Sequence, residues 1–224
     1  NDKNLYPETI EFRFRTPNSV GSSGSMVLLQ KSGSGAGSEG SWAISLQDNG
    51  TTDDYGYLRF AISSSNSSTG VDPVQYITSS LNAFYNDDFW SVMLTRKSAS
   101  DGSAFTEDSI FASSSFELTV KQYDSTRQRI VYQSSESLET GMSSSLAAFT
   151  SSGDLYLGGS GTGNHGSQFS GSMMEFRLWS EPLSQSVFNN HVRAPKAYNG
   201  NTTSSAYDNL LLRLSLDENK NLNT

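Results

Sequence analysis

The chain has 224 residues, which is enough for one large all-β domain and too few for two of them. A formal net charge of -8, with only 15 Lys and Arg residues, excludes the basic face that a nucleic-acid-binding protein needs. The lack of cysteine excludes disulfides and thiolate metal sites, and no apolar run approaches the roughly 18 residues of a membrane span. We therefore expect neither nucleic acid nor a membrane as a partner. Twelve Phe, ten Tyr and three Trp residues predict a packed core rather than a disordered chain.

Short segments of alternating apolar and polar residues predict β-strands along most of the chain. In segment 9–15, Ile10, Phe12 and Phe14 alternate with charged residues, as expected for a strand with one buried and one solvated face. Similar strands are predicted at 26–30, 42–46, 57–62, 90–95, 116–122 and 129–133. Four long polar loops, 31–41, 63–72, 97–115 and 161–168, separate them. Loops of this kind often carry the function of a β-sandwich, so we expect binding there.

The last third of the chain contains two more strands, a helix and a final strand in a fixed order. A brief apolar strand at 154–157 ends in two glycines, and Phe169-Ser170-Gly171 opens a second strand that runs to Trp179. Pro182-Leu183-Ser184 then stops this strand and caps a short helix at 185–191. A further alternating strand is predicted at 209–216.

This order of strand, Gly-Gly, loop, Phe-x-Gly, strand and short helix resembles the closing segment of laminin G-like domains. These domains belong to the concanavalin A-like lectin and glucanase superfamily. The matching residues are Leu157, Gly158, Gly159, Phe169, Gly171, Glu175, Arg177, Trp179, Leu183 and Ser184. The resemblance implies an all-β fold, an antiparallel β-sandwich of jelly-roll type with one short helix near the C-terminus.

The resemblance also implies a place in a larger assembly. The segment from Arg177 to Asn201 is similar to segments in large structural proteins of tailed bacteriophages. We expect a laminin G-like domain at 1–200, and at 201–224 a strand that closes the sandwich or starts a following module. A virion or extracellular surface, with other subunits of that assembly and glycans as partners, is the expected setting.

The sequence does not favour catalysis. Glucanases of this superfamily place carboxylates at alternate positions of one strand, so that they project together into the cleft. No such run occurs here, and Glu175 stands two residues from Arg177, which predicts an ion pair on the sheet surface. We therefore expect no enzyme activity, with glycoside hydrolysis as the third hypothesis.

Calcium is the one metal that the resemblance brings into consideration, since many laminin G-like domains bind it at one rim of the sandwich. Asp48, Asp53 and Asp54 are the candidate ligands, because they flank one loop between two predicted strands. The same Asp48-Asn49-Gly50 sequence is also typical of a simple hairpin turn.

Two functions stay open. The first is a non-catalytic structural and adhesion module, whose loops contact a partner protein or a glycan. The second is a carbohydrate-binding, lectin-like module, with calcium as an optional cofactor, in which aromatic side chains stack on sugar rings. The candidates for stacking are the tyrosines in or near polar loops, Tyr55, Tyr57, Tyr76 and Tyr85. Trp42, Trp90 and Trp179 lie in apolar registers and are predicted to be core residues.

Overall fold

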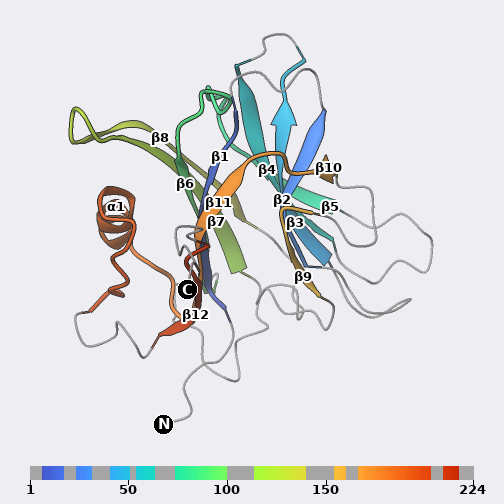
Figure 1. Cartoon of the computed structure of the whole chain (residues 1–224). Helices are drawn as coiled ribbons and strands as arrows, with labels where there is room; N and C mark the ends of the chain where they lie inside the picture. Colours follow the sequence, from blue (N-terminus) through green and yellow to red (C-terminus); the bar gives the residue numbers. More distant parts are fainter. Residues whose placement is uncertain are drawn as a thin grey trace, which may run out of the picture.

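The structure is a computed structural model that describes residues 7–17, 24–31, 41–50, 54–63, 74–99, 114–139, 154–159, 166–202 and 209–216. Over these residues the chain forms two β-sheets packed face to face, with a helix on the outside of one of them (Figure 1). The predicted all-β sandwich with a short helix near the C-terminus is thus confirmed.

Sheet A has six strands in the order β12-β11-β1-β6-β7-β8, and each is antiparallel to its neighbours. Its strands are β1 (Thr9–Arg15), β6 (Trp90–Ala99), β7 (Ser114–Asp124), β8 (Arg129–Glu139), β11 (Ser172–Trp179) and β12 (Leu210–Leu214). Ile10, Phe12 and Phe14 of β1 are buried between the two sheets, as predicted. The prediction of a solvated opposite face is wrong, because Thr9 and Glu11 are buried as well.

Sheet B is built around β2 and lies opposite sheet A. It has the strand order β10-β2-β3-β4-β5, and β9 also pairs with β2. Its strands are β2 (Ser25–Lys31), β3 (Ser41–Asp48), β4 (Gly56–Ser63), β5 (Val74–Thr78), β9 (Leu155–Leu157) and β10 (Ser167–Gln168). Only the short β10–β2 pair is parallel among the described strands.

The three tryptophans are buried, as the sequence predicts. Trp42 and Trp90 belong to the main core between the sheets, where Phe84 packs edge-on against the Trp90 ring. Trp179 belongs to a second core on the other face of sheet A. Fully burying a large apolar side chain stabilises the fold by about 1.5–3 kcal/mol, so these two clusters hold the three layers together.

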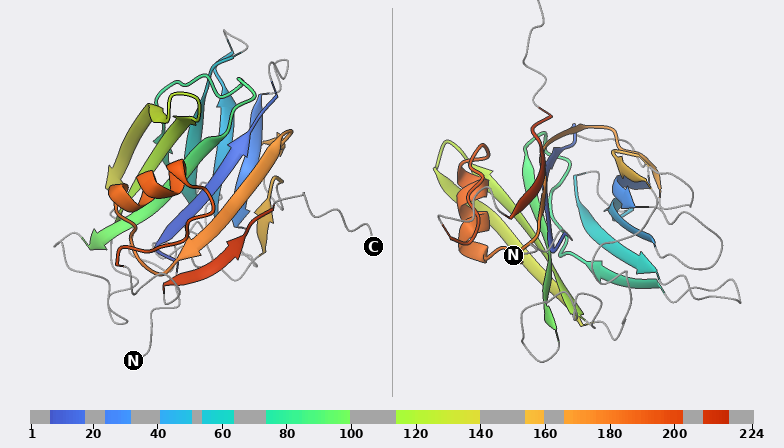
Figure 2. Two further views of the ribbon diagram at one scale, coloured as in Figure 1. Left: turned by 60° about the vertical axis from the view of Figure 1, so that its left-hand side comes forward. Right: turned by 90° about the horizontal axis from the view of Figure 1, so that it is seen from below.

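Helix α1 (Gln185–Arg193) covers the second core. Ser184 caps it by accepting a hydrogen bond from the backbone N–H of Val187, and Val187, Phe188 and Val192 form its buried face. This face packs against Trp179 and Met93 of sheet A. Figure 2 shows the helix lying across the outer face of this sheet.

The Phe-x-Gly element has a steric explanation. A Cβ atom on Gly171 would lie 2.3 Å from the carbonyl oxygen of Arg15 and 2.5 Å from the Phe169 ring. Glycine at this position therefore lets the chain enter β11 beside β1 while Phe169 packs against the main core.

Several strand assignments differ from the sequence prediction, most clearly those of β5, β8 and β10. Strand β5 was not predicted, because in its described part the buried Ile77 lies between exposed residues and gives too short a pattern. Strand β8 extends six residues past the predicted end at 133, since pairing with β7 fixes its polar Ser- and Glu-rich end. Residues 167–168 were predicted as part of a loop but form strand β10. The inner parts of the four predicted loops lie outside the described residues.

Candidate functional site

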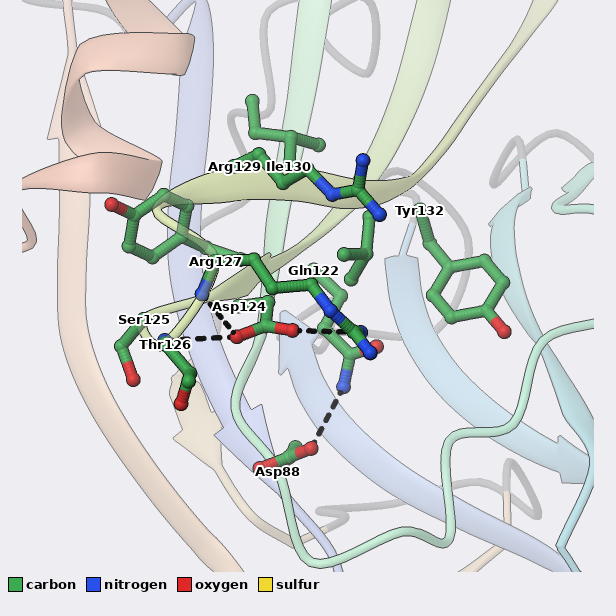
Figure 3. Close-up of a pocket in the computed structure, with 11 residues that line it drawn as sticks. Asp88, Gln122, Asp124, Ser125, Thr126, Arg127, Arg129, Ile130 and Tyr132 are labelled. Atoms are coloured by element: carbon green, nitrogen blue, oxygen red, sulfur yellow. Dashed lines mark hydrogen bonds and ion pairs between the residues drawn. The ribbon is translucent and has the colours of Figure 1, made fainter.

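A pocket of about 740 Å³ opens at the end of sheet A where β7 turns into β8. We call it the rim pocket, and it is lined by Asp88 with residues 122–127 and 129–132. In Figure 3 the turn with Asp124 and Arg127 lies at one side, Tyr132 at the other, and Gln122 between them. A volume of this size suits a ligand of one to a few sugar rings.

The base of the rim pocket is a row of side chains from three neighbouring strands. Trp90 pairs with Gln122, and Gln122 pairs with Tyr132, so all three point to the same face of sheet A. The Tyr132 ring centroid lies 5.6 Å from the buried Trp90 ring, yet Tyr132 is 49% exposed. The Tyr132 ring therefore has an exposed aromatic surface, while the buried Trp90 ring packs against it from the core.

Polar groups surround this aromatic surface. The side-chain amide of Gln122 donates a hydrogen bond of 3.4 Å to the Asp88 carboxylate, which orients both groups at the pocket base. Arg129 also lines the pocket and is exposed, and it forms no ion pair with another residue of the described ranges. Carboxylate, amide and guanidinium groups beside a planar ring are the elements that bind sugar hydroxyls.

The turn at the far side of the pocket is fixed by Asp124. Its carboxylate accepts hydrogen bonds from the backbone N–H groups of Thr126 and Arg127, each at 2.9 Å. The same carboxylate forms an ion pair of 3.0 Å with the guanidinium of Arg127. The backbone N–H of Arg127 contributes most to lowering the pKa of Asp124. Because this carboxyl is held ionised, it is a poor general acid, and its role is to shape the turn.

The tyrosines predicted to stack on sugars do not meet in one pocket. Tyr55 and Tyr76 are exposed, Tyr57 is half-buried, and the guanidinium of Arg59 lies 3.7 Å from the Tyr76 ring centroid. Tyr76 pairs with Ala61, four residues along β4 from Tyr57, so the backbone positions of the two tyrosines lie about 13 Å apart along the strand direction.

Tyr85 requires a correction. It is only 2% exposed and belongs to the main core, where burial, with a smaller contribution from Asp48, raises its pKa to about 12. A sugar ring has no access to it, and the sequence prediction for this residue is wrong. A tyrosine beside a polar loop looks exposed in the sequence, but here the backbone of residues 82–85 folds in against Gly56 and Asp54.

The predicted calcium ligands do not assemble into a metal site in the part of the chain that is described. The Asp48 carboxylate accepts a hydrogen bond of 2.9 Å from the backbone N–H of Gly50, whose φ is +70°, so it closes a tight turn. Asp54 is exposed, and Asp53 lies outside the described residues. No group of three His, Cys, Asp or Glu side chains that could hold a metal ion occurs among the described residues.

Glu175 forms the ion pair predicted with Arg177, at 2.8 Å, but not on the surface. Both side chains are buried under the segment that follows α1, and Arg213 of β12 pairs with the same carboxylate at 2.8 Å. Glu175 has a φ of +52° because it is the extra residue of a β-bulge opposite β1. The charge of Glu175 is therefore part of a network of ion pairs with Arg177 and Arg213.

Sequence reasoning missed the rim pocket. Tyr132 was included in a predicted strand, and nothing in one sequence shows that sheet A ends beside it. The one signal in the sequence was that Tyr132 lies three residues after Arg129, where β8 begins at the end of a turn.

Comparisons with known proteins support the fold. No family model matches the chain, and no curated protein matches its sequence. Full-length tailspike protein 2 from an Escherichia coli O157:H7 bacteriophage is similar in structure, with a TM-score of 0.52 and 12% identity. The match covers 97% of this chain and 25% of the tailspike chain, so this chain spans about a quarter of that protein's length. The CBM40 module of the Ruminococcus gnavus IT-sialidase matches with a TM-score of 0.47 and 11% identity, over 84% of each chain.

At these identities the tailspike likeness shows the fold alone, and it defines the chain as a β-sandwich domain. In the described residues no helix is long and apolar enough to cross a membrane.

Proposed function

We propose that this domain is a non-catalytic adhesion module of a larger surface or virion protein, which contacts glycans through the rim pocket. The observation that carries this proposal is Tyr132, a half-exposed ring held against buried Trp90 inside a polar pocket. A pyranose ring would stack on Tyr132, while Gln122, Asp88 and Arg129 would hydrogen-bond its hydroxyls.

The proposed absence of catalysis rests on the acids of the pocket. Glycoside hydrolysis needs one carboxyl that can be protonated and a second that acts as nucleophile or base. Asp124 is held ionised by its own turn, and Asp88 is hydrogen-bonded to Gln122. We therefore do not expect the domain to hydrolyse glycosidic bonds.

The parent assembly is a separate part of the proposal. We assign the sandwich to the laminin G-like group of the concanavalin A-like superfamily, displayed on a virion or extracellular surface beside other subunits. The structural likeness to part of a phage tailspike supports this setting. The pairing of β12 with β11 supports assigning residues 201–224 to closure of the sandwich that 1–200 begins.

A glycan array followed by calorimetric titration tests the binding proposal. Saturable binding should be lost on Tyr132→Ala and kept on Tyr76→Ala, because Tyr76 is equally exposed but lies on sheet B. Binding that is lost only on Tyr76→Ala would move the site to sheet B. If the domain binds no glycan, the proposal of glycan binding fails, and contacts with partner proteins are left as the adhesive function. New reducing ends in a polysaccharide digest would overturn the non-catalytic assignment.

A further inference from the structure

The two edges of sheet A differ in how they are protected against pairing with a further strand. At one edge, β8 carries the charged residues Arg129, Glu136 and Glu139, and charges on an edge strand discourage such pairing. At the other edge, β12 pairs only with β11 among the described strands. Figure 2 shows β12 at the border of the sheet, on the opposite side from β8. The residues of β12 therefore decide whether this edge can accept another strand.

The face of β12 that turns toward the space between the sheets carries a row of leucines. Leu214 pairs with Phe176 of the main core, and Leu212 pairs with Leu178, which packs against that core. Leu212, Leu214 and the following Leu216 are nevertheless 36–40% exposed. The apolar surface continues past Leu216 into a groove of about 610 Å³, which is also lined by Leu157, Phe169 and Met173. An exposed apolar row on an edge strand is a surface that another chain can cover.

The backbone of β12 has hydrogen-bonding groups on its outer side. The carbonyl oxygen of Ser215 accepts a hydrogen bond of 3.1 Å from the N–H of Glu175, so the backbone of Ser215 faces β11. This direction alternates along an antiparallel strand, so the N–H and C=O groups of Leu212 and Leu214 point away from β11. No described strand lies on that side. An extended segment is therefore the kind of occupant that would complete these hydrogen bonds.

The one charge on β12 is engaged on the other face of the strand. Arg213 forms an ion pair of 2.8 Å with Glu175, and its guanidinium lies 5.4 Å from the Tyr198 ring centroid. The sequence from 209 to 216 has no other charged residue and no proline. Since each chain has a formal net charge of -8, two copies repel each other over most of their surfaces, and this uncharged edge is a place where they can meet.

We propose that the occupant of this edge is a second copy of the chain, whose β12 pairs antiparallel with this one about a two-fold axis at Leu214. A segment that covers leucines at every second position needs apolar side chains at the same spacing, and β12 has them. The axis at Leu214 places the two Leu214 residues opposite each other, and each Leu212 opposite Leu216 of the other copy. Arg213 then faces Ser215 rather than another arginine.

The pair joins the two six-stranded sheets A edge to edge. The rim pocket lies between β7 and β8, at the edge of the sheet that is farthest from β12, so both rim pockets stay open. Two pockets on one rigid pair would raise the avidity for a surface that displays many copies of a ligand. The pairing itself does not depend on what the rim pocket binds.

Single cysteines test the pair and its register, because the chain has no cysteine of its own. Leu214 and Leu212 are matched positions, at 36% and 37% exposure on the same face of β12. In the proposed pair the two Cα atoms of residue 214 lie about 5.5 Å apart, which suits a disulfide, and those of residue 212 lie about 13 Å apart. Mild oxidation of the whole chain should link Leu214→Cys into covalent dimers and leave Leu212→Cys unlinked. Equal linkage of both variants, or of neither, would overturn the proposal.

Sedimentation equilibrium measures the pair without a cross-link. The unmodified chain should be dimeric, and Leu214→Lys should be monomeric at the same concentration while its circular dichroism is unchanged, because a charge is placed on the edge. Leu81→Lys is the control, since Leu81 is 52% exposed and lies outside both sheets, and this variant should stay dimeric. An unmodified chain that is monomeric at all concentrations would overturn the proposal. Protection of the Leu212 and Leu214 amides from hydrogen exchange in such a monomer would assign the edge to another segment of the same chain.

Discussion

Glu175 is the residue at which the ion pairs beneath the C-terminal segment converge. It accepts hydrogen bonds from Arg177 and Arg213 while it is only 6% exposed. Removing one partner of a buried pair leaves an uncompensated charge, so Glu175→Gln should lower the free energy of unfolding by about 3 kcal/mol. Urea denaturation measures this, with Glu136→Gln as a control, because Glu136 accepts a solvent-exposed hydrogen bond from Ser80 and has no ion pair among the described residues.

The same residue gives a pH dependence with a definite sign. Burial raises the pKa of Glu175, but the hydrogen bonds from Arg213 and Arg177 outweigh it and hold this pKa below its usual value. The associated stability is therefore present above about pH 4.3 and is lost as the pH falls further. The wild-type protein should lose more stability than Glu175→Gln between about pH 5 and pH 3. Parallel pH profiles would show that Glu175 is not the responsible acid.

Lys121 gives a dependence of the same sign at alkaline pH. Its ammonium group is buried under α1, where it donates to Gln185 and Asn189, and burial lowers its pKa to about 8. The unfolded chain binds this proton up to about pH 10.4, so the stability of the fold should rise with pH between about 8 and 10. Thermal melts of the Lys121→Met variant should not show this rise of stability with pH. A rise that persists in the variant would assign it to another group.

At the scale of elements, helix α1 was predictable because its start has a chemical signal. Pro182-Leu183-Ser184 precedes it, and the Ser184 hydroxyl accepts from Val187 at 3.3 Å. Ser184→Ala should therefore destabilise the protein by about 1 kcal/mol, while the exposed Asn190→Ala should not. Chemical denaturation of the two variants compares them, and an equal loss in both would exclude a capping role.

The strands divide into those with a strong pattern and those that depend on pairing. β1 was predictable from Ile10, Phe12 and Phe14, because these apolar side chains stand at every second position and enter the main core. The polar end of β8 forms a strand because it pairs with β7. The bulge at Glu175 forms because β11 pairs with β1 across a shift in register. Contacts of this kind join residues far apart in the chain, so a local pattern does not contain them. The rim pocket was missed for the same reason.

At the scale of the whole molecule, the two hydrophobic cores account for the stability of the described part of a chain that has no cysteine for disulfides. Calcium was proposed from a resemblance, but Asp48 is engaged in a turn, and the described residues contain no group of three side chains that could hold a metal ion. The melting temperature should therefore be the same in chelator and in millimolar calcium, since a ligand of the folded state would raise it. Calorimetry in the two buffers checks this, and a clear rise with calcium would restore a metal site.

The central claim is that the rim pocket binds a glycan, and mapping of backbone amide shifts in a labelled domain tests it most directly. The probe is the oligosaccharide with the strongest signal on a glycan array. We predict saturable shifts at Asp88, Gln122 and Tyr132 and along the turn at 124–129, and their loss in Tyr132→Ala. Shifts gathered on β4 and β5 around Tyr76, or no saturable shift at all, would contradict the claim.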